Sequence, residues 1–429
     1  MRADFTAEQL ADPDYARSAG AIRKCVHCGF CTATCPTYVL LGDERDSPRG
    51  RIELIRAMLE KGGRPSREQV THIDRCLSCL ACTTTCPSGV DYGQLIGHAR
   101  AYVEANYRRP WPERLLRWAI PHVLTRHRHL RAGLALGRAV QGLTPWLDRL
   151  KLTSLAALLR LVPEAETAPR GVGTYPAVEA QRGRVILLQG CVEPAMAPQV
   201  REAAVRLLAR AGFDVELVAG EGCCGAISEH LGRADEARVM ARRNVRAWAA
   251  AGEVDAIVTT AAGCGTTLKA YDHVLGEAGA PVAAKARDIL EFLAEVGLPP
   301  IVNRQAIAVA YHAPCSLQHG QKVLAEPARL LAEAGFDVRA VPEGHLCCGS
   351  AGVYNVLQPE LATALRDRKA ANIMRTGAQV VVAGNVGCMA QIAPALDLAV
   401  VHPVELLDWA TGGPRPTALD RLPSRRAPV

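Results

Sequence analysis

The chain has 429 residues and a formal net charge of +7, and only 4% of its residues are aromatic. This length predicts two or three domains with cores built mainly from aliphatic side chains. Most of the positive charge falls in one segment and aromatic stacking residues are few, so we expect no nucleic-acid partner. The sequence has no apolar signal core and no run of eighteen apolar residues, so we expect neither export nor a membrane span.

Eight of the sixteen cysteines form two matching runs near the amino terminus, each followed directly by proline. Each run reads C-x2-C-x2-C-x3-C-P, the ligand spacing of a bacterial ferredoxin with two [4Fe-4S] clusters. In that arrangement three cysteines of one run share a cluster with the last cysteine of the other run. The predicted ligands are Cys25, Cys28, Cys31 and Cys86 for cluster 1, and Cys76, Cys79, Cys82 and Cys35 for cluster 2.

Two other uses of eight cysteines are less consistent with this chain. Disulfide frameworks belong to small secreted domains, and structural zinc sites use one set of four ligands rather than triplets with a distant fourth. Reduced thiolates that bind iron indicate the cytoplasm or the cytoplasmic face of the inner membrane.

Residues 1–106 form the predicted ferredoxin-like domain, and a helix is expected between its two cysteine runs. Ser47 is a suitable amino-terminal cap, and Gly62 and Gly63 are suitable terminators of an amphipathic stretch that reaches Leu59. The arginines that open this helix, Arg49 and Arg51, could screen cluster charge, dock a partner or only face solvent.

Residues 107–175 are predicted to form a basic helical connector. Between residues 107 and 160 there are eleven Arg or Lys against Glu113 and Asp148, together with Trp111, Trp118 and Trp146. Basic amphipathic helices with tryptophan at the apolar boundary bind anionic membrane surfaces or partner subunits. We prefer a surface-binding role to a helical linker that packs only on its own chain.

The remainder of the chain contains an internal duplication, residues 176–300 and 301–413, followed by a Pro- and Arg-rich tail, residues 414–429, that we expect to be disordered. Four cysteines recur with a displacement of 124 residues: Cys191, Cys223, Cys224 and Cys264 in repeat 1, and Cys315, Cys347, Cys348 and Cys388 in repeat 2. Each cysteine pair is followed by glycine.

The pattern within each repeat predicts an α/β fold. Short apolar runs such as 185–188 and 380–383 lead directly into cysteine-bearing loops, so the cysteines should gather at the carboxyl edge of a parallel sheet. The fold class is therefore multidomain, α+β and α/β: a helical dicluster ferredoxin-like domain followed by a duplicated α/β Cys-Cys-Gly domain.

The repeat cysteines have three possible roles. They could bind a cluster or another metal, act as redox-active thiols, or simply pack as small apolar side chains. We favour metal binding, because glycine after a cysteine pair lets backbone approach a bulky inorganic ligand. We interpret His312, His319 and His345 as polar residues satisfied by nearby backbone rather than as ligands or proton relays, and His27 as a surface spacer.

No glycine-rich dinucleotide motif follows a predicted strand, and Ala226 stands where a P-loop has lysine. The chain shows no Ser/His/Asp constellation either, so we predict no catalytic residues and no flavin or NAD on this chain. A flavin-bearing partner that handles hydride is the natural inference.

These motifs together resemble the iron–sulfur subunit of bacterial glycolate oxidase. The resemblance rests on the paired cysteine runs, on residues 24–31 and 46–51, and on residues 314–321 and 344–352 around the second Cys-Cys-Gly. It implies a complex with flavoprotein subunits that oxidise glycolate to glyoxylate, with this subunit relaying electrons towards a membrane acceptor such as quinone.

Related families keep other functions open: the iron–sulfur subunits of lactate or glycerol-3-phosphate dehydrogenases, and a catalytic subunit like heterodisulfide reductase. In the last of these, Cys-Cys-Gly domains hold non-cubane clusters with a further cysteine in a final C-x2-C. Here Thr267 and Gln391 occupy those positions, which argues against such clusters. A third possibility is that the duplicated half is a metal-free platform for partner subunits.

Overall fold

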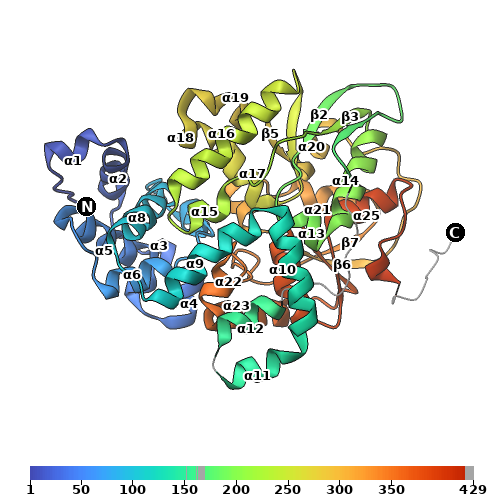
Figure 1. Ribbon diagram of the computed structural model, residues 1–429. Coiled ribbons are helices and arrows are strands. Elements are labelled where there is room, and N and C mark those ends of the chain that lie inside the picture. Colours follow the sequence, from blue (N-terminus) through green and yellow to red (C-terminus); the bar gives the residue numbers. More distant parts are fainter. Residues whose placement is uncertain (151, 161, 163–169, 421–429) are drawn as a thin grey trace.

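The computed structural model describes residues 1–150, 152–160, 162 and 170–420 (Figure 1). Three parts follow one another in the chain and pack together: a helical amino-terminal domain, a set of connecting helices, and two α/β repeats. This is the predicted fold class.

The amino-terminal domain is entirely helical within the described residues. Its elements are α1 (Ala7–Ala11), α2 (Pro13–Lys24), α3 (Phe30–Ala33), α4 (Pro36–Leu41), η1 (Glu44–Asp46), α5 (Pro48–Lys61), α6 (Arg67–Asp74), α7 (Ala81–Thr85) and α8 (Tyr92–Asn106). The predicted helix between the cysteine runs is α5. Ser47 caps it by accepting a hydrogen bond from the Gly50 amide, and it ends at Gly62, whose φ is +68°. Its apolar face, including Ile55 and Leu59, is fully buried in the domain core.

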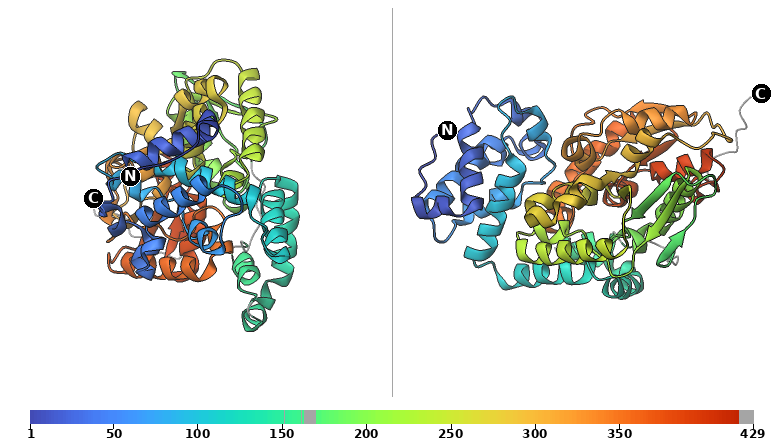
Figure 2. Two further views of the ribbon diagram at one scale, coloured as in Figure 1. Left: turned by 90° about the vertical axis from the view of Figure 1, so that its left-hand side faces the viewer. Right: turned by 90° about the horizontal axis from the view of Figure 1, so that it is seen from above.

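The connector is helical, as predicted, and lies across the face of both repeats (Figures 1 and 2). It comprises α9 (Trp111–Leu124), α10 (His127–Val140), η2 (Gln141–Leu143), α11 (Thr144–Arg149) and α12 (Thr153–Arg160). Ile120 packs with Leu231 of repeat 1 and Val353 of repeat 2, and Leu134 packs against Ala195. Among the described residues, no helix has both the length and the apolar character that crossing a bilayer requires.

Repeat 1 contains a five-stranded sheet in the order β1-β3-β2-β4-β5, in which β1 is antiparallel and the other strands are parallel. Its elements are β1 (Gly173–Tyr175), β2 (Gly183–Leu187), α13 (Glu193–Met196), α14 (Pro198–Arg210), β3 (Phe213–Leu217), α15 (Ala226–His230), α16 (Ala234–Ala250), β4 (Ala256–Thr259), α17 (Ala262–Lys269), α18 (Tyr271–Leu275), η3 (Gly276–Ala278), α19 (Ala280–Lys285), β5 (Ala286–Asp288) and α20 (Ile289–Val296). Strand β1 lies just before residue 176, where the repeat was predicted to begin.

Repeat 2 contains a parallel sheet in the order β7-β6-β8-β9, which matches β3-β2-β4-β5 strand for strand. Its elements are β6 (Ala308–His312), η4 (Ser316–Gln321), α21 (Glu326–Glu333), β7 (Asp337–Ala340), α22 (Tyr354–Leu357), α23 (Pro359–Met374), β8 (Val380–Ala383), α24 (Val386–Ile392), η5 (Ala393–Ala395), β9 (Ala399–Val401), α25 (Pro403–Ala410) and η6 (Thr417–Leu419). The duplication read from the cysteines is thus also a duplication of topology.

The two sheets share one apolar core, because helices from each repeat pack against helices of the other. Helix α14 of repeat 1 packs on α25, and its counterpart α21 packs on α20, so the contact is nearly symmetric. The predicted disorder of the tail is wrong for residues 414–420, since η6 lies there and Leu419 is fully buried in this core. The rest of that prediction, residues 421–429, lies outside the described residues.

Candidate metal centres

The two ferredoxin-type loops wind in the same way. His27 and Ser78 have φ of +55° and +51°, and two residues later Gly29 and Leu80 have φ of +88° and +62°. These left-handed positions turn the backbone between the first three cysteines of each run, ahead of the short helices α3 and α7 that carry the third cysteine. His27 is exposed, as expected for a spacer, and it also supplies one of these turns.

The eight amino-terminal cysteines line two separate cavities. The first is bordered by the four cysteines predicted for cluster 1, together with Cys82; the second is bordered by Cys35, Cys76, Cys79 and Cys82, the four predicted for cluster 2. Each cavity therefore combines residues from both runs, although the runs are far apart in the sequence. The assignment of individual ligands remains a prediction.

Arg51 is buried beside the second cavity and has a partner for each part of its guanidinium. Its Nη2 lies 3.0 Å from both Asp46 Oδ1 and Thr37 Oγ1, its Nε donates to the His72 carbonyl at 2.7 Å, and its Nη1 lies 3.8 Å from Cys35 Sγ. The side chain is 1% exposed, so it cannot dock a partner. Its place next to Cys35 fits the screening of cluster charge.

Arg49 has a different environment from Arg51. It pairs with Glu44 at 2.5 Å on the surface, lies 3.3 Å from the His27 carbonyl and borders the first cavity. Of the two arginines, only Arg49 is accessible to another protein. The sequence pattern alone does not distinguish Arg49 from Arg51.

Burial shifts the pKa values of the cysteine thiols at the second cavity, and at one of them nearby cations outweigh its effect. Burial raises the pKa of Cys79 and Cys82 well above its usual value. Burial would also raise the pKa of Cys76, but the charges of Arg51 and Arg100 outweigh this and hold that pKa below its usual value. The thiolate form needed for metal binding is thus favoured at Cys76.

All eight cysteines of the repeats border one shared cavity of about 480 Å³. In each repeat the first cysteine follows the central strand, β2 or β6, the pair follows β3 or β7, and the last lies in the helix after β4 or β8. The prediction that they gather at the carboxyl edge of a parallel sheet is confirmed. The opposite wall is apolar and comes from the connector, including Leu124, Leu134 and Leu159.

The glycine after each cysteine pair has a conformational role in its turn. Gly225 and Gly349 have φ of +101° and +91°, and a Cβ on Gly349 would lie 2.5 Å from the Ala362 carbonyl oxygen. A Cβ on Gly225 would similarly approach Ala237 at 3.2 Å. Glycine therefore allows a left-handed turn against the following long helix, while the Gly349 amide donates to Cys347 Sγ at 3.4 Å.

Repeat 2 adjoins the ferredoxin-like domain directly. Leu77 and Cys79 belong to one buried apolar cluster with Cys347, and Cys315 packs against that cluster. Cys315 Sγ and Cys347 Sγ are 3.8 Å apart. The cysteines predicted for cluster 2 are thus neighbours of the repeat 2 cysteines, a contact that no local sequence signal indicates.

The histidines near repeat 2 behave differently from one another. His319 is satisfied as predicted: its Nε2 lies 3.1 Å from the His345 carbonyl, and its Nδ1 lies 2.8 Å from Thr84 Oγ1. For His312 the prediction is wrong, because neither ring nitrogen has a hydrogen-bond partner although the residue is 2% exposed. Burial, with a smaller effect of Lys369, lowers the pKa of His312 to about 3.

The two positions that carry a further cysteine in heterodisulfide reductase make ordinary structural contacts here. Thr267 donates to the Gly263 carbonyl at 3.2 Å, and the Gln391 amide is held by Ala362 and Asn355 at 3.1 and 3.0 Å. Neither side chain is available to replace the missing thiolate.

Comparison with known proteins places these observations in a family. A model of the 4Fe-4S dicluster domain matches residues 21–90, and a model of the cysteine-rich CCG domain matches residues 185–269 and 309–393. The glycolate oxidase iron–sulfur subunit of Escherichia coli (strain K12) is 38% identical over 96% of this chain and 99% of its own length. This chain belongs to the family of glycolate oxidase iron–sulfur subunits.

Other relatives extend this picture. A probable glycolate oxidase iron–sulfur subunit of Bacillus subtilis (strain 168) is 31% identical over 92% of this chain and 95% of its own length. One subunit of a fumarate reductase (CoM/CoB) from Methanothermobacter marburgensis is 32% identical over 53% of this chain and 46% of its own length. The resemblance read from the motifs is confirmed, and the amino-terminal domain is a [4Fe-4S] dicluster domain.

Proposed function

We propose that this chain is the electron-transfer subunit of a glycolate oxidase complex. Flavoprotein partner subunits would oxidise glycolate to glyoxylate, releasing two electrons and two protons, and this chain would carry the electrons to a membrane quinone, which takes up two electrons and two protons. Bound iron–sulfur clusters accept and release electrons one at a time, whereas a flavin accepts hydride. The names of the Escherichia coli and Bacillus subtilis relatives support the substrate.

The observation that carries this proposal is the continuous row of cysteine groups. The two cavities of the dicluster domain share Cys82, Cys79 adjoins Cys347 of repeat 2, and both repeats border one cavity. Such a row connects the amino-terminal domain with the apolar cavity beneath the connector. A chain that only provided a structural platform would not need cysteines at each step.

The apolar cavity supports a quinone as the acceptor. Its volume, about 480 Å³, is in the range of small-molecule sites, and its connector wall is built from aliphatic side chains that suit an isoprenoid ligand. We place the two-electron, two-proton reduction of the quinone at this cavity.

The outer face of the connector supports association with an anionic membrane surface. Trp111 is 74% exposed, and Trp118 and Leu136 are also largely exposed. Two of the basic side chains serve the fold instead: Arg109 and Arg117 are buried and bind Asp74 at 2.6 and 3.2 Å. The connector thus packs on its own chain with one face and presents tryptophan and arginine with the other, as an interfacial helix does.

The relay is tested in the assembled complex with Cys28→Ser and Cys79→Ser. Glycolate-dependent reduction of a dye that takes electrons directly from the flavin should persist. Glycolate-dependent reduction of a quinone analogue should be lost. His27→Asn, in the same loop and compatible with a positive φ, is the matched control and should retain both activities. Normal quinone reduction in either cysteine variant would refute the proposal.

Membrane association is tested separately by flotation with anionic vesicles. The double variant Trp111→Ser/Trp118→Ser should lose binding, and Val239→Ser, an exposed apolar residue on α16, should not. Unchanged flotation of the double variant, with loss of partner subunits instead, would assign this face to a protein interface.

A second candidate function is thiol or disulfide chemistry within the cavity itself, favoured by the placement of eight cysteines around one space. Iron content and activity of the chain purified without its partners separate the two. More than about eight irons per chain with no disulfide turnover supports a relay that continues from the two cubane clusters into the repeats; disulfide turnover by the isolated chain supports catalysis here.

A further inference from the structure

His312 is the last residue of β6 and is buried among the cysteines of repeat 2 with no partner for its ring. Both ring nitrogens are inaccessible to solvent and form no hydrogen bond. Leaving a buried polar group unpaired forfeits its hydration without replacing it, so such groups are rare and need a reason. A ligand that binds the imidazole would provide one.

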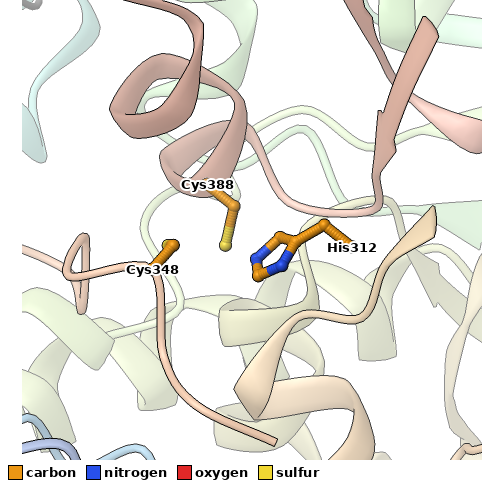
Figure 3. Close-up of side chains that lie close together, drawn as sticks. All are labelled: His312, Cys348 and Cys388. Atoms are coloured by element: carbon orange, nitrogen blue, oxygen red, sulfur yellow. The ribbon is translucent and has the colours of Figure 1, made fainter. Parts of the chain in front are cut away.

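The ring of His312 lies beside the sulfur of Cys388, with Cys348 of a different element on the same side (Figure 3). A ring nitrogen of His312, the Sγ of Cys348 in the Cys-Cys-Gly turn and the Sγ of Cys388 in α24 all lie within 4.8 Å of one another. Donors bound to one metal at about 2.0–2.3 Å are separated by distances of this order. The three donors converge without any carboxylate among them.

Two other buried histidines, His402 in repeat 2 and His72 in the dicluster domain, have different surroundings. His402 caps α25, and both its nitrogens are engaged: Nε2 lies 2.9 Å from the Thr260 carbonyl, and Nδ1 accepts from the Val404 amide at 3.2 Å. The group formed by Asp43, Asp46 and His72 differs too, because Asp46 is neutralised by Arg51.

Repeat 1 has no imidazole at the corresponding place. The displacement of 124 residues that relates the cysteines also relates His312 to Leu188, which follows β2 and borders the cavity shared by the eight repeat cysteines. The four cysteines of repeat 1 therefore have no nitrogen donor at this position, whereas those of repeat 2 do.

We propose that His312 is a metal ligand, binding together with Cys348 and Cys388, and that the two repeats consequently hold chemically different centres. Repeat 1 offers thiolates alone, and repeat 2 offers a mixed thiolate and imidazole set. Thiolate with imidazole is the ligand chemistry of zinc and of iron–sulfur clusters with histidine ligation. The inference concerns this ligand set and does not depend on glycolate as the substrate.

The test uses the complete complex, purified anaerobically from cells with ¹⁵N-labelled histidine. X-ray absorption at the iron and zinc edges, together with pulsed electron paramagnetic resonance, reports a histidine nitrogen on a metal without any activity assay. We expect a nitrogen neighbour at one of the two edges. A ¹⁵N coupling to a reduced paramagnetic centre identifies an iron cluster, and nitrogen at the zinc edge alone identifies zinc.

Three variants tie that signal to His312. His312→Leu, which copies repeat 1, should lose the nitrogen signal and lower the metal affinity by about 10–100-fold. His312→Cys should lose the nitrogen signal but retain the metal, and His402→Asn is the matched control that should change neither. A nitrogen signal that survives in His312→Cys, or its absence from the unmodified protein, would overturn the proposal.

If quinone reduction is lost while the nitrogen signal is normal, the proposed function fails and the ligand assignment stands. If quinone reduction is normal and the nitrogen signal is absent, the ligand assignment fails alone.

Discussion

The two repeats have the same strand order and the same cysteine positions, but the surroundings of those cysteines differ. Where repeat 1 has Leu188, repeat 2 has His312, and where repeat 1 has Ala261, repeat 2 has Asn385, whose side chain lies 3.5 Å from Cys388 Sγ. The two repeats share the cysteine frame and differ in the residues around it. Such residues can add a donor, as proposed for His312, or tune a metal centre whose ligands are set, as Asn385 would.

A third difference involves charge. Gly225 faces Ala237 and Gly349 faces Ala362, which aligns Asn244 of repeat 1 with Lys369 of repeat 2. Asn244 donates to the Cys223 carbonyl at 3.0 Å, whereas Lys369 donates to the Glu343 carbonyl at 2.8 Å and brings a buried positive charge towards the repeat 2 cysteines. Both repeats contact the dicluster domain, but within the described part of the chain the repeat 2 cysteines Cys347 and Cys315, and not those of repeat 1, share the apolar cluster of Cys79.

The largest expected effect is on quinone reduction, and it tests the order of the two repeats in the row of cysteine groups. In the complex, Cys347→Ser/Cys348→Ser and Cys223→Ser/Cys224→Ser should each reduce quinone reduction by about 100-fold or more. After addition of glycolate, the repeat 2 variant should leave the proposed centre of repeat 1 oxidised, because the cysteines that cluster with Cys79 belong to repeat 2. The repeat 1 variant should still show a reduced centre in repeat 2. Spectra of the opposite kind would reverse the proposed order.

The contact between the repeats is symmetric in its helices but not in its charges. Asp408 of α25 is 1% exposed and binds Arg206 and Arg210 of α14, whereas the counterpart of Arg206 on α21, Arg329, pairs with Glu333 in solvent. Asp408→Ala should lower the unfolding free energy by about 2–3 kcal/mol, since the two arginines lose a buried acceptor but stay partly exposed.

Arg329→Ala is the control and should cost less than about 0.5 kcal/mol in urea-induced unfolding. Equal effects of the two substitutions would show that the buried ion pair contributes nothing specific to the contact between the repeats.

With an iron cluster as the proposed repeat 2 centre, Lys369→Asn, which copies repeat 1, should lower its midpoint potential by about 60 mV, equivalent to a tenfold change in a one-electron equilibrium. A nearby positive charge favours the reduced and more negative state. Asn244→Lys should shift repeat 1 in the opposite direction. Potentiometric titration of the complex measures both, and an unchanged potential in Lys369→Asn would show that this charge does not distinguish the repeats.

The smallest expected effect concerns the caps of the last helix in each repeat. Burial raises the pKa of Asp288 at α20 to about 7 from an unfolded value of 3.8, so its contribution to stability is lost as pH rises through about 7. Burial lowers the pKa of His402 at α25 to about 4 from 6.5, so its contribution is lost as pH falls through about 4. In the pH range where both groups act, their contributions change the unfolding free energy in opposite directions.

Between pH values of about 4 and 6.5, removing either cap should therefore change the slope of stability against pH with opposite sign. Asp288→Asn should make the slope more positive, and His402→Asn more negative, each by about 1 kcal/mol per pH unit. Urea denaturation across this window measures the slopes. Slopes that shift in the same direction would mean that these caps do not titrate as their burial implies.

The sequence by itself determined much of the chemistry of this protein. The spacing of the cysteines within each run, the displacement of 124 residues between repeats and the apolar runs before each cysteine are local or periodic features, and they specified the dicluster domain, the duplication and the sheet edge. Local spacing is informative because ligand geometry and strand pattern depend on neighbouring residues.

Only the tertiary structure decided which side chains meet. Arg49 and Arg51 look alike in the sequence, but one lies on the surface and the other is buried beside Cys35. The contact of Cys79 with Cys347 and the lack of a hydrogen-bond partner for the His312 ring depend on how separate elements pack. The burial of a side chain and the presence or absence of its hydrogen-bond partners arise from that packing. No periodicity along the chain encodes them.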